Sequence, residues 1–214
     1  MSYRLKTIEL FSGTGSFSQV ALKHGYEINT YDLADHADEL VEGTHTQSNI
    51  LDKNVVYPKG IHILWASPPC EGFSVAVIGR NWNKDHTPKT DSARLGLEIL
   101  DRTIEVIADL KPSYWYLENP RGKMRKVIDP IFEKHGITDY VRHTITYCQY
   151  GDTRMKPTDI WTNDPHWTPR LICKNGAPCH VSAPRGSKTG TQGIKGARNR
   201  SIIPGQLFEE IFSC

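Results

Sequence analysis

The chain has 214 residues and a formal net charge of +2, a composition typical of one globular domain with a substantial core. No apolar run approaches membrane-spanning length, we expect no secretory signal, and the five cysteines are an odd number. These features predict a single domain, residues 1–214, without membrane contact, in a reducing cytoplasmic compartment where thiols are free for chemistry or for a metal.

The beginning of the chain predicts a nucleotide-binding strand-helix-strand unit. Residues 6–11 form a first strand, and a glycine-punctuated turn leads to a helix that Ser16 can cap. Residues 26–32 form the next strand, which ends in Asp32. Glycines let a ligand approach the backbone and an acid can bind ribose hydroxyls. A G-x-G turn alone does not distinguish NAD, nucleotide and S-adenosylmethionine sites.

The remaining pattern predicts an α/β doubly wound sheet that is mostly parallel, with an antiparallel hairpin at its edge. Strands are expected before residue 49 and at 61–66, 114–117, 139–147 and 158–162, and helices at 91–110, 123–134 and 204–212. We expect a mobile loop at 75–90 and a loop-rich stretch at 163–199.

Two of these strands end in residues that can carry chemistry. Ser67-Pro68-Pro69 ends one strand and holds Cys70 in a stiff loop, and Glu118-Asn119-Pro120 ends the next strand. Because parallel strands end at one rim of a sheet, we expect Cys70 as a nucleophile and Glu118 as a general acid to meet there. The alternative for Cys70 is a buried cysteine that acts as a small hydrophobe.

Four segments, in this order, resemble motifs of the cytosine-C5 DNA methyltransferase family: ELFSGTGSFSQVA (9–21), SPPCEGFSVA (67–76), YLENPRG (116–122) and YGDTRMKPTDIWTN (150–163). The resemblance implies a Rossmann-like fold that binds S-adenosylmethionine and transfers its methyl group to C5 of cytosine in DNA. In that family the cysteine forms a covalent adduct at C6, and a base in a duplex must be flipped out.

The resemblance also implies the site residues. The catalytic set comprises Cys70, Glu118, Asn119, Arg154 and Lys156, with Arg154 or Lys156 supplying a cation that also lowers the pKa of Cys70. The cofactor-binding set comprises Phe11, Gly13, Gly15, Asp32, Leu33, Asn49, Ile50, Pro69 and Ser201. For Phe11 and Ile50 a place in the core, and for the glycines a simple turn, are the structural alternatives.

Three departures from the family pattern bear on the function. Glu71 stands where the family usually has Gln, and the Gln-x-Arg-x-Arg motif is reduced to residues 154–158. Residues 163–200 stand in place of the large target-recognition region, so we expect short or low sequence specificity, or a partner subunit. An RNA cytosine-C5 methyltransferase and a catalytically weak nucleic-acid-binding subunit are the alternatives.

Residues 165–208 contain no Asp or Glu but many Lys and Arg, which suits DNA as a partner at residues 165–200; a solvated basic loop is the alternative. The same stretch holds His166, Cys173, Cys179 and His180, which could bind zinc. Their spacing matches no standard zinc site, so free thiols and surface histidines are favoured, and we expect His143 and Cys148 to be packed in a strand.

Overall fold

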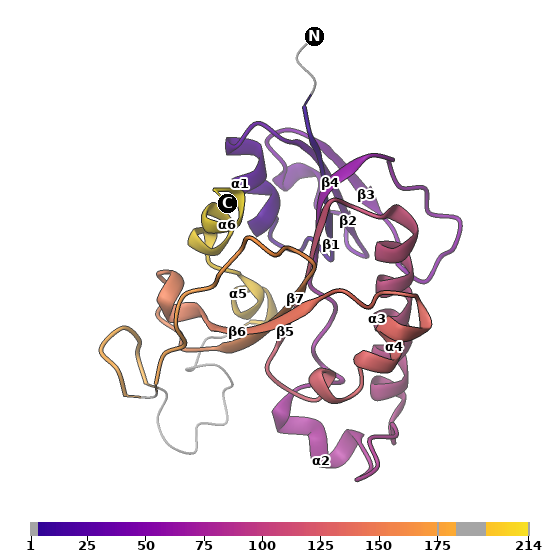
Figure 1. The fold of residues 1–214 in the computed structure, drawn as a ribbon, viewed down its shortest axis with the longest axis vertical. Helices are drawn as coiled ribbons and strands as arrows, with labels where there is room; N and C mark the ends of the chain where they lie inside the picture. The colour runs from indigo at the N-terminus through magenta and orange to yellow at the C-terminus, as the bar shows by residue number, and fades with distance from the viewer. Residues whose placement is uncertain (1–3, 175, 183–195, 214) are drawn as a thin grey trace.

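The computed structural model describes residues 4–174, 176–182 and 196–213 of the chain. Within them a seven-stranded sheet has the strand order β3-β2-β1-β4-β5-β7-β6 (Figure 1). The strands are β1 Lys6–Leu10, β2 Glu27–Asp32, β3 Thr44–Gln47, β4 Ile61–Ala66, β5 Tyr114–Pro120, β6 Val141–Thr146 and β7 Pro157–Thr162.

Strands β1 to β5 pair in parallel, and β7 pairs antiparallel with both β5 and β6. The predicted mostly parallel sheet with an antiparallel hairpin is therefore confirmed. The strand order reverses between β1 and β4, where Leu10 pairs with Ala66. In such sheets a ligand crevice opens at the carboxyl ends of the two strands that flank this point.

The helices are α1 Ser16–Lys23, α2 Ile78–Asn81, α3 Asp91–Leu110, α4 Asp129–Lys134, α5 Ala197–Ser201 and α6 Gly205–Phe212. Single 3₁₀ turns are η1 Ala37–Glu39, η2 Val75–Val77, η3 Met124–Lys126 and η4 Tyr147–Tyr150. Among the described residues, no helix combines the length and the apolar character that crossing a membrane requires.

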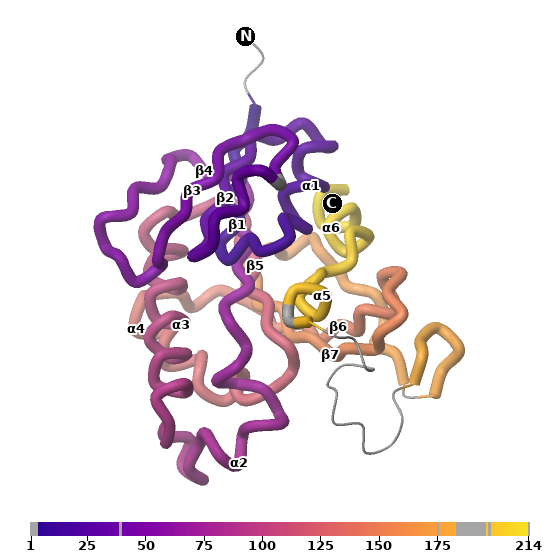
Figure 2. Tube along the Cα trace, turned by 180° about the vertical axis from the view of Figure 1, so that it is seen from behind, coloured from indigo at the N-terminus to yellow at the C-terminus, as the bar shows by residue number. Residues whose placement is uncertain are grey.

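The helices cover the two faces of the sheet, as the front and back views show (Figures 1 and 2). Along β4 the side chains alternate: Leu64 packs with α3 and α4, whereas Trp65 packs with α1 and α6. This alternation is what a strand buried on both faces requires. Both faces are thus filled, and the crevice at the strand ends is left for function.

The long helix α3 has the predicted bounds. The Thr90 hydroxyl accepts a hydrogen bond from the Ala93 N–H at 3.3 Å, and Lys111 ends the helix in a left-handed conformation (φ +46°). Leu100 and Ile104, which belong to the expected apolar stripe, are fully buried in the core that α3 forms with the sheet.

Two expectations needed correction. The expected helix at 123–134 is divided into η3 and α4, because Pro130 has no N–H to donate and is tolerated only in a first turn. The expected loop at 75–90 contains η2 and α2, and it is anchored by the buried Trp82, which stacks on Phe73 and donates its indole N–H to Gly72 O at 2.7 Å.

Candidate active site at the carboxyl edge of the sheet

The ends of β4 and β5 meet in one cavity of about 470 Å³. Cys70 and Glu118 both line it, so the two strand ends converge at one rim. The other lining residues are Glu9, Phe11, Ser12, Gly13, Thr14, Ser16, Ser67, Pro68, Pro69, Glu71, Ser74, Pro120, Lys156, Arg200, Ser201 and Ile203.

Hydrogen bonds fix the loop that carries Cys70. The Asn119 side chain donates from Nδ2 to Pro68 O at 2.9 Å, which ties the end of β5 to the loop after β4. The N–H groups of Phe73 and Ser74 donate to Cys70 O at 3.0 and 2.9 Å. Asn119 therefore positions the loop, and its buried Oδ1 has no hydrogen-bond partner among the described residues.

Glu118 is 4% exposed and accepts a hydrogen bond at Oε1 from the Tyr147 hydroxyl at 2.9 Å. Burial raises the pKa of Glu118, and this effect is partly offset by Lys156 and by hydrogen bonds from Tyr147 and Ser67. The carboxyl group is thus shifted toward its neutral form, which can donate a proton.

The expectation of a lowered pKa for Cys70 does not hold for the chain alone. Burial raises the pKa of the Cys70 thiol, and the neighbouring Glu118 raises it further, while Lys156 acts in the opposite direction. Desolvation and a nearby carboxylate both disfavour a thiolate, and one ammonium group does not outweigh them.

Of the two cations that the sequence offers, Lys156 lines the cavity and Arg154 does not. The Lys156 ammonium lies over the Tyr147 ring at 4.6 Å from its centroid. The Arg154 guanidinium is buried, pairs with Asp152 and donates to the carbonyls of Arg200 at 3.0 Å and Ile202 at 2.7 Å. The Arg154 donors are thus bonded to Asp152 and to the backbone, away from the residues that line the cavity.

A second cavity, of about 190 Å³, shares Phe11 and Pro69 with the Cys70 cavity. It is also lined by Leu10, Tyr31, Asp32, Leu33, Ser48, Asn49, Ile50 and Ile99. Most of the expected cofactor residues therefore line one or the other of these two adjoining cavities. Gly13 and Ser201 line the Cys70 cavity, whereas Gly15 lines neither of these two.

The turn between β1 and α1 is held in an unusual backbone conformation. Phe11, Gly13 and Gly15 have positive φ values of 60°, 47° and 64°. Gly13 N–H donates to Asp32 Oδ2 at 2.9 Å, which couples the turn to the end of β2. A left-handed phenylalanine is strained, and such strain concentrates at functional sites.

Glu9 is a site residue that the sequence did not reveal. Its carboxyl group lies behind the turn and accepts hydrogen bonds from the N–H groups of Phe17 (3.3 Å) and Ser18 (3.0 Å) and from the Ser18 hydroxyl (2.5 Å). Burial raises its pKa to about 7. The only sequence signal was an acid between Ile8 and Leu10, the two apolar residues of this strand.

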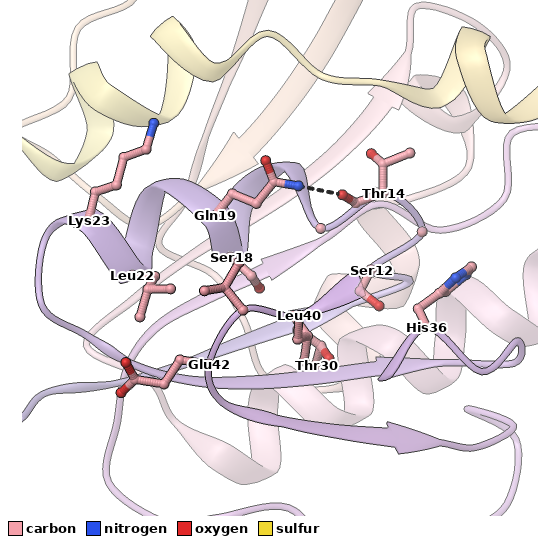
Figure 3. Close-up of a pocket in the computed structure, with 13 residues that line it drawn as sticks. Ser12, Thr14, Ser18, Gln19, Leu22, Lys23, Thr30, His36, Leu40 and Glu42 are labelled. Carbon is pink, nitrogen blue, oxygen red and sulfur yellow. Dashed lines mark hydrogen bonds between the residues drawn. The ribbon is translucent and has the colours of Figure 1, made fainter. Parts of the chain in front are cut away.

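A third cavity, of about 420 Å³, shares Ser12, Gly13 and Thr14 of the glycine turn with the 470 Å³ cavity (Figure 3). Leu22 of α1 and Leu40 contribute to its wall, and the Gln19 side chain braces the turn by donating to Thr14 O at 3.0 Å. Gly15 lines this cavity, but Cys70 and Glu118 do not. The reactive groups therefore belong to the 470 Å³ cavity.

The expected zinc residues are only partly brought together. His166 lies against the Tyr114 ring, with 6.5 Å between ring centroids, and is separate from the other three. Cys173, Cys179 and His180 cluster with the buried Cys148 instead. In the basic segment, Arg170 forms an ion pair with Glu210. Three further basic residues of this segment, Arg185, Lys188 and Lys195, lie outside the described residues.

Known proteins are similar to this chain in sequence and in fold. The family described as C-5 cytosine-specific DNA methylase matches residues 5–134. A frog virus 3 (isolate Goorha) protein named as a probable DNA (cytosine-5)-methyltransferase is 31% identical over 183 residues, which are 82% of this chain and 78% of that protein.

Two solved structures have the same fold. EhMeth, a methyltransferase of Entamoeba histolytica, has a TM-score of 0.52 at 14% identity, over 80% of this chain and 57% of that one. The S. pombe Dnmt2 methyltransferase has a TM-score of 0.51 at 13% identity, over 77% and 52%. This chain matches only about half the length of these two proteins. On its sequence match, the chain belongs to the C-5 cytosine-specific DNA methylase family.

Proposed function

We propose that the chain transfers a methyl group from S-adenosylmethionine to C5 of cytosine in DNA, through a covalent bond between Cys70 Sγ and C6 of the base. The observation that carries the proposal is the single cavity lined by Cys70, Glu118 and Lys156, which shares Phe11 and Pro69 with the cavity at Asp32. A nucleophile and an acid thus share one space, and a nucleotide-type cavity adjoins it.

The crevice suits the proposed methyl donor. Asp32 offers carboxylate oxygens for ribose hydroxyls, and Leu33 and Ile50 offer apolar contact for a flat base. The buried Ser12 hydroxyl at the turn lacks a hydrogen-bond partner among the described residues, which a polar ligand group would supply. When bound there, S-adenosylmethionine supplies a methyl group on a positively charged sulfur.

The residues around the cavity make C5 of the base nucleophilic. The Cys70 thiolate forms a bond to C6, and the electron pair of the C5–C6 double bond moves toward N3, where Glu118 donates its proton. After C5 has gained the methyl group, its proton leaves to solvent, the C6–S bond breaks and Glu118 recovers its proton. Lys156 offsets the negative charge, which Cys70 carries before it bonds to C6 and Glu118 carries after it has donated its proton.

A cytosine in a duplex cannot reach this cavity while stacked, so a duplex target is flipped out of the helix. The acid-free segment 165–200 is the proposed contact with the phosphate backbone. Because this segment is short, we propose a short target sequence, with a partner subunit as a further source of recognition.

The test is incubation of the purified chain with tritiated S-adenosylmethionine and either duplex DNA or structured RNA. We expect label in DNA and none with Cys70→Ser, which must melt at the same temperature as the parent chain. Label in RNA alone would overturn the DNA assignment, and no label in either would overturn the enzymatic one.

A second measurement tests the adduct itself. DNA that contains 5-fluorocytosine cannot lose its C5 substituent as a proton, so the C6–S bond persists. We expect a complex that survives denaturant with the parent chain and not with Cys70→Ser. Methylation of ordinary DNA without such a complex would contradict the covalent step.

A further inference from the structure

A cluster of four possible metal ligands lies outside the proposed active site. Sγ of Cys148, Cys173 and Cys179 and a ring nitrogen of His180 lie within 4.8 Å of one another. Cys148 belongs to η4, and the other three belong to the segment after β7, which returns to this turn in the fold (Figure 1). We propose that this cluster is a zinc site.

The distances suit one tetrahedral ion. With Zn–S and Zn–N bonds near 2.3 and 2.0–2.1 Å, the ligands of a tetrahedral site are separated by about 3.5–3.8 Å. Cys173 Sγ lies 3.2 Å from Cys179 Sγ and 3.5 Å from His180 Nδ1, and Cys179 Sγ lies 3.7 Å from the same nitrogen. Small shifts would seat all four ligands around one centre.

The backbone holds the ligands from several directions. Cys173 N–H donates to the Thr146 hydroxyl at 2.9 Å, and Val181 N–H donates to Thr153 O at 2.9 Å. The hydrogen bonds thus fix both ends of the ligand-bearing segment against the corner between β6 and β7. His180 Nδ1 contacts two of the thiols, and its buried Nε2 has no partner among the described residues.

The donor set selects the ion. Three thiolates and one imidazole form a closed four-ligand set, which is typical of structural zinc and leaves no open position for catalysis. Binding releases the three thiol protons to solvent. A Cys173–Cys179 disulfide is the competing state, but it would leave Cys148 and His180 without a role in the cluster.

The site would brace the region beside the active site. The Val181 N–H donates a hydrogen bond to Thr153 O, and Thr153 lies three residues before Lys156 in the chain. An ion at this cluster would therefore tie the start of the basic segment to the turn that leads to Lys156. It would do so from outside the 470 Å³ cavity, because none of the four ligands lines that cavity.

The test is metal analysis of the untagged full chain by inductively coupled plasma mass spectrometry, after dialysis without chelator. We expect about one zinc per chain, at least a tenfold lower content in Cys179→Ser and His180→Ala, and unchanged content in the control His166→Ala. Cys179 is exposed, which favours folding of its variant, whereas a Cys148 variant could fail to fold for lack of packing.

Cobalt(II) added to metal-free protein provides a second readout. We expect the intense absorption of tetrahedral thiolate-bound cobalt, lost in Cys179→Ser and kept in His166→Ala. A chain without zinc that also fails to bind cobalt in this way, zinc that persists in both ligand variants, or a Cys173–Cys179 disulfide found by mass spectrometry under reducing cellular expression would each overturn the proposal. None of these results depends on methyltransferase activity.

Discussion

The Tyr147 hydroxyl donates a hydrogen bond to Glu118 Oε1 at 2.9 Å, and both side chains are buried. Tyr147 lies in η4, directly after β6, whereas Glu118 belongs to β5. The edge hairpin therefore positions the hydroxyl group that binds the Glu118 carboxyl group. A hydrogen bond of this kind favours the carboxylate and counteracts the burial that raises the pKa of Glu118. The phenol is therefore one of the groups that determine how strongly Glu118 holds its proton, beside burial and Lys156.

Tyr147→Phe removes this donor, so the pKa of Glu118 should rise further. If protonated Glu118 is the active form, the alkaline limb of kcat/KM against pH should move to higher pH. A limb that stays in place would show that Glu118 does not titrate in the reaction.

Removal of the Glu118 charge should make Cys70 more reactive toward an alkylating agent. Because Glu118 raises and Lys156 lowers the pKa of Cys70, Glu118→Gln should shift the midpoint of iodoacetamide alkylation to lower pH and Lys156→Met to higher pH. Peptide mass spectrometry reports the alkylation of Cys70 alone. The exposed residues Glu98 and Lys59 provide the matched controls Glu98→Gln and Lys59→Met, which should not move the midpoint.

The same Glu118→Gln variant should lose DNA methylation by a factor of about 10² or more, because a general acid contributes about 10²–10⁴. Its alkylation and its methylation would thus change in opposite directions. If Glu118→Gln methylates DNA as fast as the control Glu98→Gln, Glu118 is not the general acid. That result would not bear on Cys70, which has its own test.

Local patterns were sufficient to predict the sheet and the rim at which its reactive residues meet. Ile61–Ala66 followed by two prolines marks a buried strand with an abrupt end, and the helix stripe of Asp91–Leu110 repeats at helical spacing. Other features depend on contacts between distant segments. Glu9 looks like a strand residue until α1 is placed over it, and Cys148 joins Cys173 only through the return of the chain to η4.

Glu9 should make the free energy of unfolding fall as the pH rises. Its pKa is about 7 in the folded chain against an ordinary 4.5, so the folded chain keeps a proton that the unfolded chain releases between these values. The stabilising contribution is complete below about pH 4.5 and lost above about pH 7, and it amounts to about 3 kcal/mol.

The glutamine of Glu9→Gln cannot ionise, so this variant does not lose that contribution. Between pH 4.5 and 8 the free energy of unfolding of the parent should therefore fall by about 3 kcal/mol relative to that of the variant. Urea denaturation at several pH values measures it. Glu27→Gln, at an exposed position of β2, is the matched control and should follow the parent. If the two variants behave alike, the Glu9 carboxyl group has an ordinary pKa.

Arg154 and Lys156 should separate into a structural and a catalytic cation. Arg154→Lys keeps the charge but loses the planar fork that binds Asp152 and the carbonyls of Arg200 and Ile202, so we expect a loss of about 3 kcal/mol in stability. Lys156→Met should melt near the parent temperature and lose methylation at least tenfold. Thermal denaturation and the tritium assay, run on both proteins, distinguish the roles. An Arg154→Lys protein with the parent melting temperature and no activity would place the guanidinium at the substrate, against the geometry found in the fold, in which its donors are bonded to the chain itself.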